Sequence, residues 1–185
     1  MENESVKEQL IQATVKLLLE TNDASKITAR QIASESKANL GMINYYFTSK
    51  DALVHTAVNR LIEERGIQLK EIMNGDTPSK QKLIDFLIKL SDITIEYSQF
   101  TKATIPYTLL KREIEEPYYI LPMIKDCFGD RKSETECRII AYQLTSFSQV
   151  VFYRSTDFKK YTGIDIMDKV QRDALFHSLI NIFGL

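Results

Sequence analysis

The sequence is poor in cysteine and has no excess of basic residues. Its two cysteines, Cys127 and Cys137, stand alone without CxxC spacing, which is typical of a reducing cytosol; they are either structural thiols or a redox pair. The formal net charge of −1 argues against a protein that coats nucleic acid nonspecifically, but it leaves room for a local basic face.

Membrane and export signals are also lacking. The longest uncharged run, residues 139–153, contains polar side chains and is too short to span a bilayer. The N-terminal segment is acidic and amphipathic, unlike a signal peptide. We therefore expect a soluble, cytoplasmic protein with no membrane partner.

Motifs for catalysis and for metal or cofactor binding are missing too. The sequence has no GxSxG, no HExxH, no phosphate-binding glycine loop and no Cys/His nucleophile arrangement. Its two histidines, His55 and His177, lie far apart and lack a ligand-spaced partner. We expect no metal, no cofactor and no enzymatic activity.

No segment shows the period-two alternation of strands, so the hydrophobic pattern predicts an all-α fold without internal repeats. Helices are expected over residues 5–20, 50–73 and 79–100. Another is expected from Ser133, with Glu136 as its capping-box partner, to a break at 161–163. Asp165 is expected to cap the last helix.

Prolines and one glycine are expected to end or interrupt the helices. Gly75 would end one helix, and Thr77 would cap the next with Pro78 at its first position. Three further prolines are expected to divide the middle of the chain into short pieces: Pro106, Pro117 and Pro122.

The segment 28–50 predicts two short helices joined by a tight turn. Thr28 can cap the first helix, with Gln31 closing a capping box, and residues 36–38 interrupt it. Asn39 can cap the second helix.

The second short helix is predicted to have an apolar side and a polar side. Leu40, Ile43 and Phe47 form one stripe at i, i+3 and i+7. The other side carries Asn44 and two tyrosines, which suits a helix that enters the DNA major groove; the alternative is an ordinary helical hairpin.

Ile32-Ala33, the Gly41-x-Ile43-x-x-x-Phe47 run and the segment 49–53 (SKDAL) resemble the N-terminal DNA-binding domain of the TetR-type transcriptional regulators. The resemblance covers about the first quarter of the chain, one three-helix unit. Lys37 stands where the family usually has glycine, which would cost about 1 kcal/mol in a left-handed turn. Thr48 stands where proline is frequent, and it could cap the following helix with Asp51.

The resemblance implies a DNA-binding domain over residues 1–52 and a helical effector-binding and dimerisation domain over 53–185. It implies phosphate contacts by Tyr46 and Lys50, and base contacts by the side of the second helix that bears Asn44. The full set of expected DNA-binding residues is Thr28, Arg30, Gln31, Asn39, Leu40, Gly41, Met42, Asn44, Tyr45, Tyr46 and Lys50.

The aromatic middle of the chain has two interpretations. Aromatic side chains at helical spacing often fill a core, but mixed tyrosine hydroxyls and apolar groups also suit a ligand site. By resemblance, the family's effector pocket lies among the corresponding helices. Its candidate residues are Tyr97, Phe100, Tyr107, Tyr118, Tyr119 and Met123.

The resulting hypothesis is a homodimeric repressor that a small-molecule effector releases from a palindromic operator by pivoting the helix 50–73. Dimerisation is expected through Ser133–Arg154 and Asp165–Phe183, where small residues permit close approach. One alternative is an all-α small-molecule-binding protein or enzyme whose N-terminal unit is only structural. Another is a constitutive DNA-binding protein without an effector.

Overall fold

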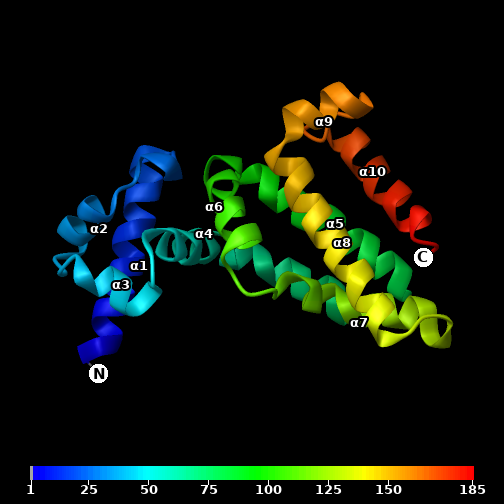
Figure 1. The fold of residues 1–185 in the computed structure, drawn as a ribbon, viewed down its shortest axis with the longest axis horizontal. Helices are drawn as coiled ribbons and strands as arrows, with labels where there is room; N and C mark the ends of the chain where they lie inside the picture. Colours follow the sequence, from blue (N-terminus) through cyan, green and yellow to red (C-terminus); the bar gives the residue numbers. More distant parts are fainter. Residues whose placement is uncertain (1) are drawn as a thin grey trace. The chain divides into compact units, whose positions relative to one another are not determined.

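The chain folds into helices joined by short connections (Figure 1). The computed structural model describes residues 2–185, with the side chains of residues 2–5, 64 and 65 excepted. Within this range there are ten α-helices and two short 3-10 helices, and no strand. The prediction of an all-α fold is confirmed.

One compact unit contains the residues up to 64 together with residues 97–111. It is built around a core in which Leu10, Leu18, Ile32, Leu53 and Phe100 are almost fully buried. Its elements are α1 (Glu2–Thr21), η1 (Ala24–Lys26), α2 (Ala29–Ser36), α3 (Gly41–Phe47), the first part of α4 (Lys50–Asn74) and α6 (Ser98–Leu110).

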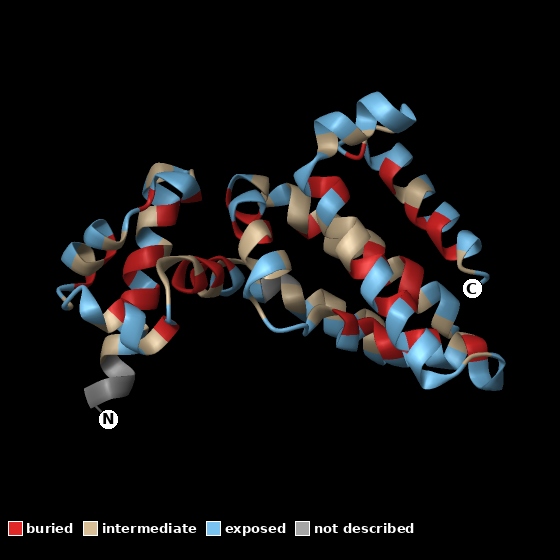
Figure 2. Cartoon of the chain, viewed as in Figure 1, coloured by how far each residue is buried: buried red, intermediate tan, exposed pale blue. Residues whose placement is uncertain are grey.

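The second compact unit contains residues 65–96 and 112–185. Within it, α7 packs against both α5 and α8, and α10 packs against α5. Buried and exposed residues recur along α8 in the way an amphipathic helix requires (Figure 2). Its elements are the rest of α4, α5 (Ser79–Glu96), α7 (Glu116–Phe128), η2 (Gly129–Arg131), α8 (Glu134–Tyr153), α9 (Ser155–Thr162) and α10 (Lys169–Ile182).

The two compact units are defined by the packing of the helices. Their limits differ from the functional domain boundary expected between residues 52 and 53. Helix α4 runs through position 52 without interruption, and α6 returns to the first unit. The boundary at 52/53 stays a prediction about function.

Three expected helix caps are wrong. Ser49 caps α4, since its Oγ accepts the Ala52 N–H at 3.1 Å, whereas Thr48 is left-handed with φ 63°. Asp168 caps α10 by accepting the Gln171 N–H at 2.9 Å, in place of Asp165. Pro78 stands before the first residue of α5, so Thr77 is not its cap.

The helix breaks also differ from those predicted. The expected helix 79–100 ends at Glu96, and the helix from Ser133 ends at Tyr153, with α9 following. Pro106 and Pro122 lie inside α6 and α7 and do not divide them. Each proline removes only one backbone hydrogen bond, and buried residues on both sides keep the helix in place.

Candidate nucleic-acid interface

Helix α2 is held at its start by the capping box that the sequence predicts. The Thr28 Oγ accepts the Gln31 N–H at 3.3 Å, and the Gln31 Oε1 accepts the Thr28 N–H at 2.8 Å. Ile32 is fully buried in the first core, and α2 packs beside α1 (Figure 1). These contacts fix the position from which the turn into α3 begins.

The turn between α2 and α3 is left-handed at Lys37, with φ 56° and ψ 23°. A non-glycine residue in this conformation costs about 1 kcal/mol, so the penalty anticipated for lysine applies here. Lys37 is exposed and lies in the turn, four positions before Gly41, the first residue of α3. A lysine at this position adds a cation that glycine could not supply.

Helix α3 is fixed by its apolar side. The Asn39 Oδ1 accepts the Gly41 N–H at 2.9 Å and so holds the start of α3, although Leu40, rather than the predicted Asn39, occupies the N-cap position. Ile43 and Phe47 are buried. Leu40 is 46% exposed, so its predicted place on the buried stripe is wrong. It is the N-cap residue of α3 and therefore lies just before the helical spacing of the stripe begins.

The outer side of α3 presents polar and aromatic groups to solvent. Gly41, Asn44 and Tyr45 are exposed, and Tyr45 packs edge-to-face on Tyr46 with ring centroids 4.9 Å apart. Met42 and Tyr46 are half-buried and pack against the first core, so both also support the fold. All eleven predicted DNA-contacting residues belong to the first unit.

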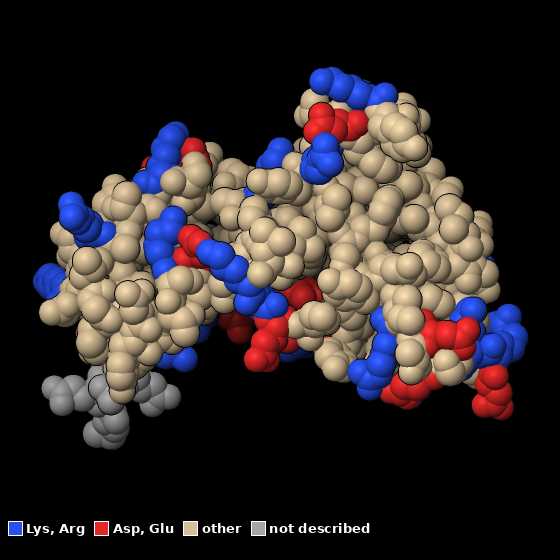
Figure 3. All heavy atoms as spheres, viewed as in Figure 1, with Lys and Arg blue, Asp and Glu red and all other residues tan. Residues whose placement is uncertain are grey.

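Cations flank this surface. Arg30 on α2 and Lys37 in the turn are exposed and form no ion pair with the described side chains. Figure 3 shows Lys and Arg side chains at the α2 end of the first unit without acidic side chains beside them on this face. Sequence reasoning treated Lys37 only as a departure from glycine; its exposure adds it to the candidate interface.

Lys50 is held more tightly than an ordinary surface lysine. Its Nζ donates to the Ile27 carbonyl at 3.2 Å and lies 3.7 Å from the Asp51 Oδ1. The side chain is 33% exposed. The ammonium is therefore fixed between the start of α4 and the residue before the α2 cap.

No family model matches the sequence. A solved structure of a TetR transcriptional regulator from Rhodococcus sp. RHA1 superimposes with a TM-score of 0.68 at 14% identity, covering 99% of this chain and 97% of that one. A TetR-like transcriptional regulator from the same organism gives 0.51 at 13% identity, covering 95% and 93%. The chain has the TetR-type fold.

A curated relative is also a transcriptional regulator. The HTH-type transcriptional regulator PksA of Bacillus subtilis (strain 168) is 28% identical over 90 residues, covering 49% of this chain. The match spans less than half of that relative's length, 43%. These relatives and structural neighbours are transcriptional regulators rather than enzymes.

Within this TetR-type fold, the six effector candidates are divided between the two units. Phe100 is buried in the first core, and Tyr97 and Tyr107 pack against it. Met123 is buried in the second core, whereas Tyr118 and Tyr119 are more than half exposed on α7. The ring centroids of Tyr107 on α6 and His55 on α4 lie 5.5 Å apart, so the two helices are in contact inside the first unit.

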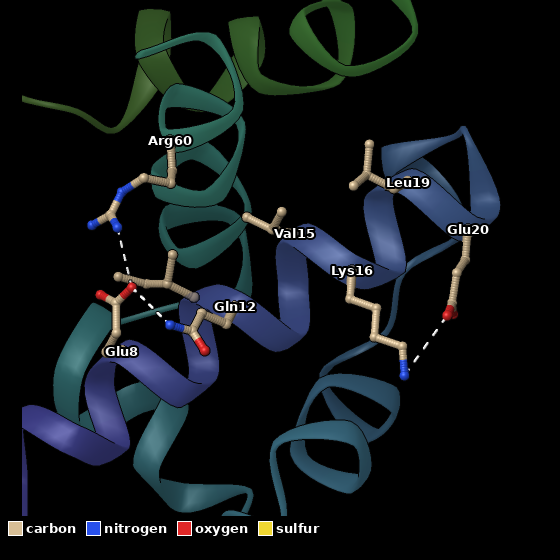
Figure 4. Close-up of a pocket in the computed structure, with 8 residues that line it drawn as sticks. Glu8, Gln12, Val15, Lys16, Leu19, Glu20 and Arg60 are labelled. Carbon is tan, nitrogen blue, oxygen red and sulfur yellow. Dashed lines mark hydrogen bonds and ion pairs between the residues drawn. The ribbon is translucent and has the colours of Figure 1, made fainter. Parts of the chain in front are cut away.

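An open groove of about 510 Å³ runs along the outer side of α1 (Figure 4). Ile11, Val15 and Leu19 give it an apolar floor. Ion pairs lie at its rim, including Arg60 with Glu8 at 3.1 Å. The groove includes none of the expected DNA-binding or effector residues.

The structure shows few other features with chemistry of their own. Among residues 2–185, no group of three His, Cys, Asp or Glu side chains could hold a metal ion. None of the described helices combines the length and apolar character needed to cross a bilayer. Cys127 and Cys137 are free thiols, and burial raises the pKa of Cys127.

Proposed function

We propose that the protein is a DNA-binding transcriptional regulator that acts in the cytoplasm and reads its operator with α3. The observation that carries this proposal is the two-sided construction of α3. Ile43 and Phe47 anchor one side in the core, and the other side exposes Asn44 and Tyr45. The nearby elements carry two exposed cations, Arg30 and Lys37, that form no ion pair with the described side chains. A short helix held in this way can enter the major groove with its polar side chains toward base edges.

In this proposal the residues divide into two roles. Asn44 and the exposed surface at Gly41 face the bases, where an asparagine side chain can pair with adenine. Tyr46, Lys50 and the exposed Arg30 and Lys37 hold phosphates, which provide affinity without sequence information. Lys50 suits its role because its ammonium is already oriented by the Ile27 carbonyl.

We further propose a homodimer through Ser133–Arg154 and Asp165–Phe183. Ile139, Tyr142, Val150 and Tyr153 are exposed at i, i+3, i+11 and i+14 of α8, which places them on one stripe. A second exposed stripe follows α10 at Val170, Ala174, Ser178 and Ile182. Two exposed stripes built from apolar and small residues suit a helical interface between two copies.

Two residues within these helices do not belong to the proposed interface. Ala141 and Leu179 are buried in the protomer's own second core. A charge at either position would disrupt the protomer itself. The dimer is therefore tested with residues from the exposed stripes.

We also propose that a small-molecule effector releases the repressor from its operator. Supporting this, α6 carries two of the effector candidates, Phe100 and Tyr107, and Tyr97 is its N-cap. Helix α6 also touches α4 through the Tyr107–His55 ring contact. Helix α4 begins directly after the α3 segment, at Lys50. A displacement of α6 can therefore reach the DNA-binding residues through α4 if the effector binds the DNA-incompetent state more tightly.

Lys50→Ala and Tyr46→Phe are expected to weaken binding to all duplexes alike. Loss of a charged phosphate contact should reduce the slope of log affinity against log salt by about 0.9 for Lys50→Ala. The Tyr46→Phe change removes one neutral hydrogen bond and keeps the packed ring, so a loss of about two- to tenfold is expected. Fluorescence anisotropy with a mixed-sequence duplex over a salt series measures both.

The matched control is Lys160→Ala, which removes an exposed lysine from α9 of the second unit. It should leave affinity and salt slope close to wild type. Unchanged binding by both Lys50→Ala and Tyr46→Phe would show that DNA does not dock on this surface.

A further inference from the structure

We propose that Lys111, the residue that follows α6, is a positioning residue for DNA binding that acts through Asp51 on Lys50. The inference rests on the proposed function, since it assumes that Lys50 holds a phosphate. It adds to the DNA-binding surface a residue that lies 60 positions beyond Asp51 in the sequence.

The three side chains form a continuous series of polar contacts inside the first unit. The Lys111 Nζ lies 3.4 Å from the Asp51 Oδ2, and the Lys50 Nζ lies 3.7 Å from the Asp51 Oδ1. The Lys50 Nζ also donates to the Ile27 carbonyl at 3.2 Å. One carboxylate therefore bridges two ammonium groups, each facing a different oxygen.

The charges explain why the bridge matters for a phosphate. Lys50 and Asp51 alone form a neutral pair, so a phosphate that approaches Lys50 meets the Asp51 carboxylate as well and is repelled by it. Lys111 neutralises that carboxylate and leaves the group with a net charge of +1. The second lysine thus restores the positive charge that phosphate binding requires.

Lys111 reaches this position because α6 is anchored in the first core. Its N–H donates to the Tyr107 carbonyl at 2.9 Å, Phe100 of the same helix is 3% exposed, and the Tyr107 ring contacts His55 of α4. The ammonium is therefore presented by an ordered element. Lys102 supplies a comparison, because it is an exposed lysine on the same helix without an ion pair to the described side chains.

A double-mutant cycle on the full-length protein tests the proposal. Affinity for a mixed-sequence DNA duplex is measured by anisotropy at low salt for wild type, Lys111→Ala, Asp51→Asn and the double variant. Lys111→Ala should weaken binding about two- to fivefold, the range in which exposed charge pairs act. In the Asp51→Asn background the same change should have no further effect, since the carboxylate that needs neutralising is gone.

Two further variants separate positioning from general charge. Lys111→Arg keeps the cation and should bind like wild type, and Lys102→Ala should leave affinity unchanged. A loss from Lys111→Ala that is equal in both backgrounds, or a loss from Lys102→Ala of the same size, would overturn the proposal. Circular dichroism checks that each variant keeps its helical content.

The same measurements distinguish the role of Lys111 from the proposed DNA binding on which it depends. If wild type binds duplex and Lys50→Ala weakens it, the interface stands and only the role of Lys111 is being decided. If wild type does not bind duplex, or Lys50→Ala has no effect, the phosphate contact fails and the role of Lys111 fails with it.

Discussion

Tyr142→Glu on α8 and Ala174→Glu on α10 are each expected to convert a dimer into monomers and to abolish operator-specific binding. Both residues are exposed in the protomer, so a carboxylate there leaves the protomer's core intact. In the proposed dimer the same carboxylate would be buried without a partner, which is strongly unfavourable. A monomer engages one half-site, and its affinity should fall to the nonspecific level, about 10³-fold or more below wild type.

Light scattering at micromolar concentration and anisotropy with an operator duplex measure the two effects. Tyr161→Glu is the matched control, because Tyr161 is 90% exposed on α9 and lies outside both proposed interface helices. It should remain dimeric and bind DNA like wild type. A wild-type protein that is monomeric under these conditions, or a Tyr142→Glu variant that stays dimeric, contradicts the proposed interface.

Asp92→Asn is expected to destabilise the second unit by about 2–3 kcal/mol. This is less than the cost of breaking a fully buried ion pair, because the Asp92 side chain is 30% exposed. The reason for the destabilisation is the ion pair that ties α10 to α5. Arg172 is only 5% exposed, and its guanidinium pairs with the Asp92 carboxylate at 2.5 Å. Loss of the carboxylate leaves a nearly buried cation without its counter-ion.

Urea unfolding followed by circular dichroism measures the change. Asp173→Asn is the matched control, because both aspartates pair with Lys169. Asp92 lies 2.8 Å from Lys169 and joins α5 to α10, whereas Asp173 lies 3.1 Å from it within α10. An exposed pair of this kind contributes about 0.5 kcal/mol or less. Equal destabilisation by both variants would show that the Arg172 pair has no special role.

The Asp92 effect should also depend on pH. Burial raises the pKa of Asp92. The hydrogen bonds from Lys169 and Arg172 outweigh this effect, so the pKa lies below its ordinary value. A carboxyl with a lowered folded-state pKa stabilises the protein above its unfolded pKa of about 3.9 and loses that contribution as pH falls through the folded value. The stability difference between wild type and Asp92→Asn should therefore be constant near neutrality and shrink in acid.

Local signals in the sequence were sufficient to predict several features of both units. The Thr28–Gln31 and Ser133–Glu136 capping boxes were predicted because both partners lie three residues apart. The anchoring of α3 by Ile43 and Phe47 followed from helical spacing. The all-α fold followed from the same periodicity.

Other features depended on contacts that spacing does not encode. Thr48 and Ser49, and likewise Asp165 and Asp168, are chemically similar cap candidates, and the structure uses the later residue of each pair. The breaks at Tyr97 and Arg154 carry no glycine or proline. The Lys111–Asp51 contact and the Arg172–Asp92 pair join residues 60 and 80 positions apart, beyond any local pattern.

Helix α3 is proposed to read DNA as part of a two-fold symmetric protein. Selection of bound duplexes from a random-sequence library with the wild-type protein tests it most directly. The enriched sequence should be a palindrome whose half-sites lie about one helical turn apart, and Asn44→Ala should lose preference at one position in each half-site. Recovery of no preferred sequence, or of the same sequence at the same affinity with Asn44→Ala, would contradict the claim.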